Sequence, residues 1–482
     1  MLVTMPPLDA AGLPRSDVRH GFLRTPMISR RHFLATTGLA FIGLQRVALS
    51  ASAPGRNAEL LGPLVPDPAR ILDLPEGFRY VLLSKRGEMM ADGFRVPGVP
   101  DGMAAFPGPE ETIVLVRNHE LALSMSGIGP FDNNLRLPDK LDPALCYDPG
   151  ENGREPHFGG TSNIVFDPQE GRVVRQFLSL TGTDRNCAGG AMPWGSWITC
   201  EEPEDLVTPR GQRHGWCFEV RATAEPGLQK PVPLKALGRF RHEAVALDPA
   251  TGFLYLTEDR NDGLLYRFIP GEKNDFTRGR LQALAISGKP KSDLRHYDPA
   301  ANWPVEGEAM QATWIDLDEV EAPKDDLRFR GFEGGAARFA RGEGIHFTKE
   351  GIFICCTDGG PARRGQIFRL KPSGKADQPD ELTLFIQSGE DDLLTNGDNL
   401  CAGPWGGLVV CEDLVDARFA SRTCLRGITP DGRMFTIARN GLDNTEFAGS
   451  CFSPDGRWLF ANMQVRGLTV GITGPWEKIT GA

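Results

Sequence analysis

The sequence predicts an all-β fold, more specifically a six-bladed β-propeller with long insertions between its strands. Apolar runs of four to six residues, bounded by Gly, Pro and Asp, recur along the chain, and no segment keeps a helical period over 15 residues. In six runs a glycine or a turn leads into an apolar strand that ends on acidic or amide residues. Matched units of this kind are typical of a propeller, in which equivalent strand ends converge on one mouth. The runs are residues 111–120, 195–202, 252–259, 351–358, 406–413 and 456–462.

Most of these runs are expected to be the second strand of a hairpin, because turn sequences such as 248–252 and 453–457 precede them. The matching first strands open with a polar residue, and Cys187 takes that place in its own unit. The start of one antiparallel strand and the end of its partner lie at the same end of a hairpin. Each of the following sets is therefore predicted to share a rim: Cys187 with Glu202, Glu243 with Glu258 and Asp259, and Glu343 with Asp358.

Two segments, residues 186–202 and 399–413, read almost alike, and each carries a cysteine ahead of a closing acid. Cys187 precedes Glu202 by 15 residues, whereas Cys401 precedes Asp413 by 12. Only the first spacing recurs in other hairpins. We therefore interpret Cys187 as a metal ligand and Cys401 as its structural echo.

The acids at the strand ends predict a metal site. Carboxylates that converge on one mouth raise one another's pKa and destabilise the fold unless cations neutralise them. Oxygen-only surroundings favour calcium or magnesium, while a thiolate such as that of Cys187 indicates a transition metal such as iron or zinc. The pattern thus predicts a mixed metal site. His119 and His242 each precede a glutamate of interest, and we expect both to be hydrogen-bonding structural residues.

Residues 1–53 are predicted to be a twin-arginine export signal, and residues 54–482 a single propeller domain. Arg30 and Arg31 precede an apolar run at 35–44, which is about half of the roughly 20 residues needed to span a bilayer. We expect a periplasmic or secreted protein that uses the twin-arginine machinery and keeps no stable membrane span after processing. The net charge of −10 argues against nucleic-acid binding.

The mature chain is longer than six blades require. It has about 430 residues, whereas each blade needs roughly 40 to 50. Insertions are therefore expected, and 124–160 and 271–341 are the best candidates because they are rich in Pro and Asp. Few disulfides are expected among the ten cysteines, since several cysteines fall inside apolar strand patterns.

Beyond these patterns, the chain resembles the PhoX-type alkaline phosphatases over most of its mature length. The cysteine motif at 187–202 is the most specific part of the resemblance. The other segments that carry it are the twin-arginine start and residues 118–120, 159–163, 239–244, 254–259, 265–268 and 341–344. The resemblance implies a monomeric propeller that hydrolyses phosphate monoesters with a pair of ferric ions, Fe(3+), and several calcium ions, Ca(2+).

The resemblance also implies roles for individual residues. Cys187 and Glu202 would ligate iron, and Arg341 would bind the phosphate. The irons would act as Lewis acids, while calcium and Arg341 would offset charge on the phosphoryl oxygens. The remaining expected metal ligands, which the sequence does not divide between iron and calcium, are Glu120, Asn163, Glu243, Glu258, Asp259 and Glu343.

Two other functions and one other fold remain open on the sequence. A calcium-dependent propeller lactonase or esterase would need one cation at the mouth and no thiolate. A non-catalytic periplasmic calcium-binding propeller would use the acids only to join its blades. A β-sandwich with appended domains would leave the six matched endings unexplained. Serine catalysis is disfavoured, because no nucleophile elbow stands between a predicted strand and helix.

Overall fold

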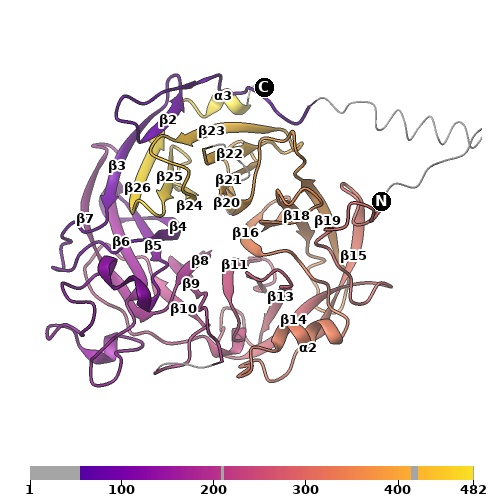
Figure 1. The fold of residues 1–482 in the computed structure, drawn as a ribbon, viewed down its shortest axis with the longest axis horizontal. Helices are drawn as coiled ribbons and strands as arrows, with labels where there is room; N and C mark the ends of the chain where they lie inside the picture. Colours follow the sequence, from indigo (N-terminus) through magenta and orange to yellow (C-terminus); the bar gives the residue numbers. More distant parts are fainter. Residues whose placement is uncertain (1–54, 208–210, 414–421, 481–482) are drawn as a thin grey trace, which may run out of the picture. The chain divides into compact units, whose positions relative to one another are not determined.

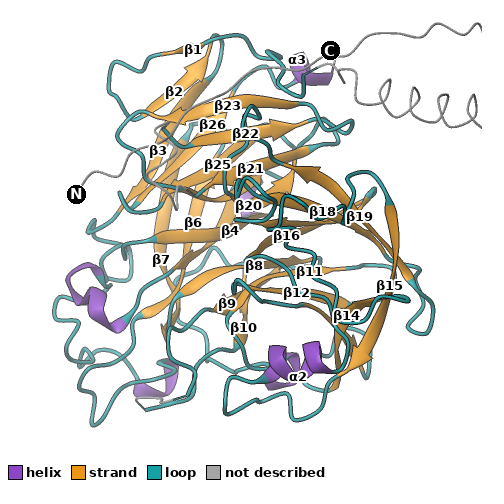
Figure 2. Ribbon diagram, turned by 45° about the vertical axis from the view of Figure 1, so that its right-hand side comes forward, coloured by secondary structure: helices purple, strands orange, loops and turns teal. Residues whose placement is uncertain are grey.

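The computed structural model describes residues 55–207, 211–413 and 422–480 (Figure 1). Residues 56–482 form one compact unit, and the fold given below is that of its described residues. The predicted export signal at 1–53 lies outside the described residues. Within them the chain forms 26 strands and only short helices, so the all-β prediction is confirmed (Figure 2).

The strands form five sheets, of which three run along the chain as follows. One sheet holds β4 (Pro100–Pro107), β5 (Ile113–His119), β6 (Gly159–Asp167) and β7 (Arg172–Thr183). A three-stranded sheet holds β8 (Asn186–Met192), β9 (Ser196–Glu201) and β10 (Cys217–Arg221). A nine-stranded sheet holds β11 (His242–Leu247), β12 (Leu254–Glu258), β13 (Leu265–Pro270), β14 (Gly279–Ile286), β15 (Ala309–Asp316), β16 (Gly342–Thr348), β17 (Gly351–Cys356), β18 (Gln366–Lys371) and β19 (Asp380–Gln387).

The other two sheets combine strands from both ends of this unit. A six-stranded sheet holds β20 (Gly397–Ala402), β21 (Leu408–Glu412), β22 (Cys424–Ile428), β23 (Met434–Asn440), β2 (Leu72–Pro75) and β1 (Leu64–Val65). A four-stranded sheet holds β24 (Phe447–Phe452), β25 (Trp458–Met463), β26 (Leu468–Thr473) and β3 (Arg79–Lys85). The helices are α2 (Leu327–Glu333), α3 (Glu477–Thr480) and the 3-10 turns η1 (Pro109–Glu111), η2 (Leu123–Ile128), η3 (Pro143–Leu145) and η4 (Lys235–Leu237).

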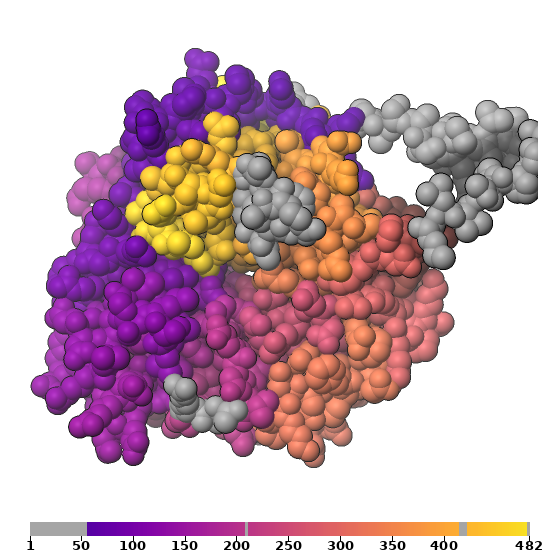
Figure 3. Space-filling model, in the orientation of Figure 1, coloured from indigo at the N-terminus to yellow at the C-terminus, as the bar shows by residue number. Residues whose placement is uncertain are grey.

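The first strand of each hairpin series lies in a closed ring, which makes the arrangement propeller-like (Figure 1). Around the ring β4 contacts β8, β8 contacts β11, β11 contacts β16, β16 contacts β20, β20 contacts β24, and β24 contacts β4. All six strands line one cavity of about 510 Å³. The space-filling view is correspondingly hollowed near its centre (Figure 3). The strand ends of the ring therefore meet around one axis.

Small residues allow the ring strands to approach one another closely. A Cβ atom on Gly190 would lie 2.0 Å from the carbonyl oxygen of Val245 on the next ring strand, and one on Gly102 would lie 2.5 Å from the Cα of Ala188. Real side chains do not tolerate such separations, so glycine is required at both positions. Gly190 in β8 and Gly102 in β4 are thus packing features of the ring.

The ring is closed by pairing the two ends of the unit. β3 pairs with β26 along its whole length, from Lys85 opposite Leu468 to Arg79 opposite Thr473. In Figure 1 the indigo β3 accordingly lies beside the yellow β26. β2 adds to β23 in a similar way. Burial of the apolar side chains of β3 therefore contributes to holding the whole ring shut.

Two details of the strand organisation differ from expectation. The segment 271–341 is not mainly an insertion, because it contains β14, β15 and α2, and β15 pairs with both β14 and β19. The segment 124–160 fits the prediction better, since it holds only η2 and η3 before β6 begins. All ten cysteines lie in the described part of the chain, are buried and form no disulfide. Among the helices that the structure describes, none is long and apolar enough to cross a membrane.

Replacing Leu83 with alanine is expected to lower the free energy of unfolding by about 2–5 kcal/mol, because its side chain is buried on the closing strand with 5% exposure. The matched control is Leu82→Ala, whose side chain is 45% exposed and whose loss is expected to cost about 0.5 kcal/mol. Urea unfolding followed by tryptophan fluorescence measures both values. Equal losses for the two variants would contradict the role given to β3 in ring closure.

Candidate metal centre

The ring strands share one irregularity at the same place. After the first residue pair of five hairpins, and after the second pair of the β24–β25 hairpin, two residues of the ring strand oppose a single residue of its partner before regular pairing resumes. Such a β-bulge bends the strand and re-aims the side chains next to it. The first residues of the six bulges, in chain order, are Asp101, Cys187, Glu243, Glu343, Asp398 and Gly449. Five of the six bulges therefore present an acid or a thiol at the mouth of the ring.

Two groups of possible metal ligands result, and they share one residue. In the first group, ligand atoms of Cys187, Glu202 and Glu243 all lie within 4.8 Å of one another. In the second group, ligand atoms of Glu243, Glu343 and Asp398 do the same. The first group offers a sulfur atom and two carboxylates, whereas the second offers oxygen alone. A side chain at the junction, that of Glu243, can serve both groups.

The electrostatics of these groups favour bound cations. Burial, together with the charges of Glu343 and Asp398, raises the pKa of Glu243 well above its usual range. Burial also raises the pKa of Glu343 and of Asp398 well above the ordinary values. The pKa of the Cys187 thiol is raised by burial and then by Glu243. Without a cation these acids resist ionisation, and a metal that binds their charged forms removes that penalty.

Further acids surround the two groups. Burial and the charge of Glu120 raise the pKa of Asp101, and burial and the charge of Asp413 raise the pKa of Glu446. We call the full set the mouth cluster: Asp101, Glu120, Cys187, Glu202, Glu243, Asp259, Glu343, Asp398, Asp413 and Glu446. Every member is buried or half-buried.

Two arginines alternate with acids along one side of the mouth cluster. Arg185 pairs with Glu120 and, at 3.1 Å, with Glu202. Arg241 pairs with the other oxygen of Glu202 and lies 3.7 Å from a carboxylate oxygen of Asp259. The two arginines hold equivalent positions, because the backbone carbonyl of each accepts the N–H of the rim acid in its own hairpin. They bring positive charge to a site with excess acid.

Arg341 continues this alternation and has the richest set of partners. Its Nε lies 2.8 Å from Asp259, one terminal nitrogen lies 2.5 Å from Glu343, and the other lies 3.6 Å from Asp413. Although burial opposes a charged guanidinium, these acids raise the pKa of Arg341 above its ordinary value. Its backbone adopts a left-handed φ of +50°, as does that of Arg185 at +48°. Such strained conformations concentrate at functional sites.

The structure brings seven of the predicted site residues into the mouth region: Glu120, Cys187, Glu202, Glu243, Asp259, Arg341 and Glu343. It does not bring Glu258 there. Glu258 pairs with His242 at the strand end. Its buried side chain points away from the mouth and accepts hydrogen bonds from the Tyr266 hydroxyl and the Leu264 N–H. Consecutive strand residues point to opposite sides, so Asp259 takes the place at the rim.

Asn163 also lies away from the mouth cluster. It stands opposite Val116 in the middle of the β5–β6 pairing, three residues beyond Gly160 at the strand end. Its side-chain amide donates a hydrogen bond to the carbonyl of Thr223. Asp358, which the spacing assigned to a rim with Glu343, turns instead to the Tyr297 hydroxyl.

Four mouth residues are missing from the ligands that the sequence nominated: Asp101, Asp398, Asp413 and Glu446. The 15-residue spacing does identify one of them, because Asp398 precedes Asp413 by 15 residues as Cys187 precedes Glu202. Asp398 and Cys187 also occupy the same bulge position. Cys401 lies three residues further on, in an apolar cluster. Asp101 carries no such signal, since a longer segment separates it from Glu120.

The residue before each acid at the rim forms the last pair of its hairpin, as Glu201 does with Asn186 and Glu412 with Gly397. Glu201 is fully buried and accepts hydrogen bonds from the N–H groups of Asp184, Gly215 and Trp216 at 2.9, 2.8 and 3.1 Å. Glu412 does the same in its own sheet, where it accepts from two backbone N–H groups. Of two neighbouring acids, the first therefore accepts backbone hydrogen bonds and the second faces the mouth.

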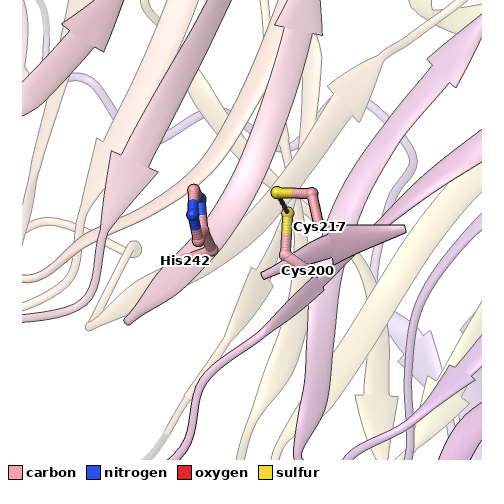
Figure 4. A group of neighbouring side chains, drawn as sticks. All are labelled: Cys200, Cys217 and His242. Carbon is pink, nitrogen blue, oxygen red and sulfur yellow. Dashed lines mark hydrogen bonds between the residues drawn. The ribbon is translucent and has the colours of Figure 1, made fainter. Parts of the chain in front are cut away.

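Cys200, Cys217 and His242 form a further buried group (Figure 4). The two thiols belong to directly paired residues of β9 and β10, and their sulfur atoms are 3.6 Å apart. The thiol of Cys187 donates to the backbone carbonyl of His242 at 3.1 Å, and the carbonyl of Cys200 lies 3.7 Å away. The His242 ring lies 3.0 Å from the Gly238 carbonyl. This group fixes the backbone that orients Cys187.

Comparisons with known proteins found two matches that bear on this chain. Residues 60–134 and 160–467 match the model of a family described as alkaline phosphatase PhoX. Among solved structures, Pseudomonas fluorescens PhoX in complex with vanadate, a transition state analogue, has a TM-score of 0.62 at 18% identity, covering 86% of this chain and 98% of that chain. No curated protein sequence matches the chain.

Two solved gluconolactonase structures are also similar to this chain, with lower TM-scores. The periplasmic gluconolactonase PpgL of Pseudomonas aeruginosa has a TM-score of 0.38 at 14% identity, covering 82% of this chain and 91% of that chain. A gluconolactonase from Xanthomonas campestris has a TM-score of 0.37 at 10% identity, covering 86% and 98%.

The neighbouring acids Glu201 and Glu202 are expected to respond differently to the same substitution, one mainly in stability and the other mainly in metal binding. Glu201→Gln should lower the free energy of unfolding by about 2–3 kcal/mol, because it removes charge from a buried acceptor of three backbone hydrogen bonds. Glu202→Gln should weaken metal binding and change the stability of the chelator-treated protein less. Denaturant unfolding and elemental analysis of both variants check this. A larger stability loss for Glu202→Gln would contradict the division of roles.

Proposed function

Because the chain belongs to the alkaline phosphatase PhoX family and is a phosphoric monoester hydrolase, we propose that it hydrolyses phosphate monoesters at a mixed iron and calcium site in the mouth of a six-bladed propeller. The observation that carries this proposal is the pair of ligand groups joined at Glu243, one with a thiol and one with oxygen alone.

A count of six blades is supported by the ring of six strands. The nine-stranded sheet divides into two series, β11 to β14 and β16 to β19, which β15 bridges at their outer edges. The three-stranded sheet is then a short blade that begins with β8. Each of the six series begins with a bulged ring strand, and a ring of this kind is the geometry of a six-bladed propeller.

The donor atoms fit the two proposed metals. The thiol and carboxylates of Cys187, Glu202 and Glu243 suit a transition metal, which the family resemblance identifies as iron. The carboxylates of Glu243, Glu343 and Asp398 suit calcium, which takes oxygen ligands. These metals would supply Lewis acidity and positive charge near the phosphate. Asp259 and Glu120 complete the acidic rim, whereas Glu258 and Asn163 hold structural positions.

Arg341 is placed to bind the phosphate of the substrate. Its planar guanidinium presents several N–H donors to the mouth and now contacts three acids. When those acids bind cations, the guanidinium can turn its donors to phosphoryl oxygens, which it matches in bidentate geometry. The charge that develops on these oxygens during phosphoryl transfer would then be offset by Arg341.

The remaining features of the proposal follow from the sequence. We infer that the twin-arginine machinery exports the chain to the periplasm or the medium, that it acts as a monomer, and that small phosphate esters are its substrates. External calcium would then be available to the acidic groups. A calcium-dependent lactonase or a non-catalytic calcium propeller requires no thiolate, so neither accounts for Cys187 beside Glu202 and Glu243.

The purified exported protein is expected to contain both iron and calcium and to release phosphate from a chromogenic monoester. Prolonged chelation should abolish that activity, because the acids of the mouth cluster repel one another and Arg341 alone cannot hold the substrate. Cys187→Ala should lose iron and the visible absorption of a ferric thiolate. Elemental analysis beside the phosphatase assay measures these outcomes. Full activity after chelation and desalting would overturn the metal proposal, and calcium without iron would favour the alternatives.

Arg341→Ala is expected to lower kcat/KM roughly 100- to 1,000-fold, the usual effect of removing a donor that stabilises transition-state charge. Arg341→Lys should keep part of the activity, because it retains charge but not the forked geometry. Arg330→Ala is the control, since Arg330 lies in α2 and pairs with Asp318. Steady-state kinetics and metal content are measured together. Unchanged kcat/KM in an Arg341→Ala protein with normal metal content would exclude the role.

A further inference from the structure

A second polar cluster lies outside the mouth cluster. Its members are Asp148, His157 and His214, whose side chains are buried at 3%, 6% and 6% exposure. Ligand atoms of all three lie within 4.8 Å of one another. Asp148 and His157 belong to the long segment between η3 and β6, and His214 to the segment that precedes β10. Two segments far apart in the sequence therefore contribute to one compact set of donors.

The His214 ring is oriented in the way that metal-ligating histidines usually are. Its Nδ1 lies 2.7 Å from a carboxylate oxygen of Glu201, the buried acid that holds backbone N–H groups. Its Nε2 faces Asp148 at 3.5 Å and has no hydrogen-bond partner. A carboxylate on one ring nitrogen fixes the tautomer and leaves the other nitrogen free to bind a metal.

His157 supplies a second free nitrogen at the same place. Its Nδ1 is buried, has no hydrogen-bond partner and lies 3.6 Å from a carboxylate oxygen of Asp184. The rings of His157 and His214 stack with centroids 4.2 Å apart. Buried ring nitrogens without partners are uncommon, because each loses its hydrogen bond to water. Two such nitrogens on stacked rings are the observation that indicates a shared ligand for both.

Two separations in and beside the cluster are close to those of donors around one ion. A hydrogen bond would bring the paired atoms to about 2.7–3.2 Å. Donors bound at about 2.0–2.1 Å in a tetrahedron around zinc lie about 3.4 Å apart. The observed distances of 3.5 Å for His214 to Asp148 and 3.6 Å for His157 to Asp184 are close to the second value.

We propose that Asp148, His157 and His214 bind a zinc ion, with Asp184 beside them as a further oxygen donor. Two imidazoles disfavour calcium and magnesium, which prefer oxygen, and suit zinc. The ion would fasten the segment around His157 to the segment before β10. It is a site separate from the proposed phosphatase centre and does not depend on that function.

An adjacent cavity gives the ion a route to the site. The cavity has a volume of about 340 Å³, and both histidines and Asp184 line it. Arg185, which pairs with acids of the mouth cluster, lines the same cavity. Asp148 and His157 fall between the two ranges that match the family, 60–134 and 160–467, so the family match assigns them no role.

The test uses the whole exported protein, stripped of metal by a chelator and then dialysed against Zn²⁺. Elemental analysis should find one zinc per chain more in the wild type than in His157→Gln. His296→Gln is the matched control, because that histidine lies elsewhere and binds Gln387. Cys187→Ala should keep this zinc, which separates the site from the mouth cluster. Zinc should also raise the Tm of the wild type and leave that of His157→Gln unchanged.

Cobalt gives an independent readout of the same site. Co²⁺ in place of zinc should show the strong visible absorption of a tetrahedral ion, and His157→Gln should lose it. Asp148→Asn provides a second variant should His157→Gln fail to fold. The proposal is overturned when folded His157→Gln or Asp148→Asn protein binds as much zinc as the wild type. Protein that is isolated with its native metals, binds this zinc and releases no phosphate from a monoester would instead count against the proposed function alone.

Discussion

Mutual repulsion among buried acids is the constraint on which the rest of this molecule depends. The ring brings Glu243, Glu343 and Asp398 within a few ångströms of one another, and burial together with the charges of nearby acids raises the pKa of each. Such a group stabilises a fold only when positive charge offsets it. The structure meets this need at the rim with Arg185, Arg241 and Arg341. Of the three acids, only Glu343 pairs with an arginine among the described ion pairs. Cations are therefore required beside Glu243 and Asp398.

The geometry that creates this repulsion also limits it. Because strand residues alternate sides, each hairpin end offers one acid to the mouth and turns its neighbour outward. Glu201 and Glu202 illustrate this, since the first holds three backbone N–H groups and the second meets two arginines. The outward acid anchors the strand end whose position decides where the inward acid lies. Fold stability and site geometry are therefore linked through adjacent residues.

The sequence predicted the parts of this arrangement that depend on local periodicity. Alternation, turns and the common end of a hairpin were enough to place Cys187 beside Glu202 and to indicate a mixed site. The choice between Glu258 and Asp259 depends on register to within one residue, which bulges alter and a pattern does not reveal. Asp101 joins the cluster only through ring closure, and the pairing of β15 with β19 joins strands whose contact no local signal encodes. Most features that the sequence did not predict therefore depend on pairing between strands far apart in the chain.

The two adjacent acids Glu201 and Glu202 also relate the second cluster to the first. Glu201 accepts from His214 at the proposed zinc site, while Glu202 belongs to the thiol-containing group at the mouth. Both stand at the end of β9, so a shift of that strand end moves both sets of donors. Arg185 reinforces the connection, because it pairs with Glu202 and lines the cavity beside the histidines. An ion that fixes the segment around His157 would therefore also restrain the rim of the mouth cluster. Metal binding by this segment, which lies outside the family match, would then stabilise the geometry of the proposed phosphatase site.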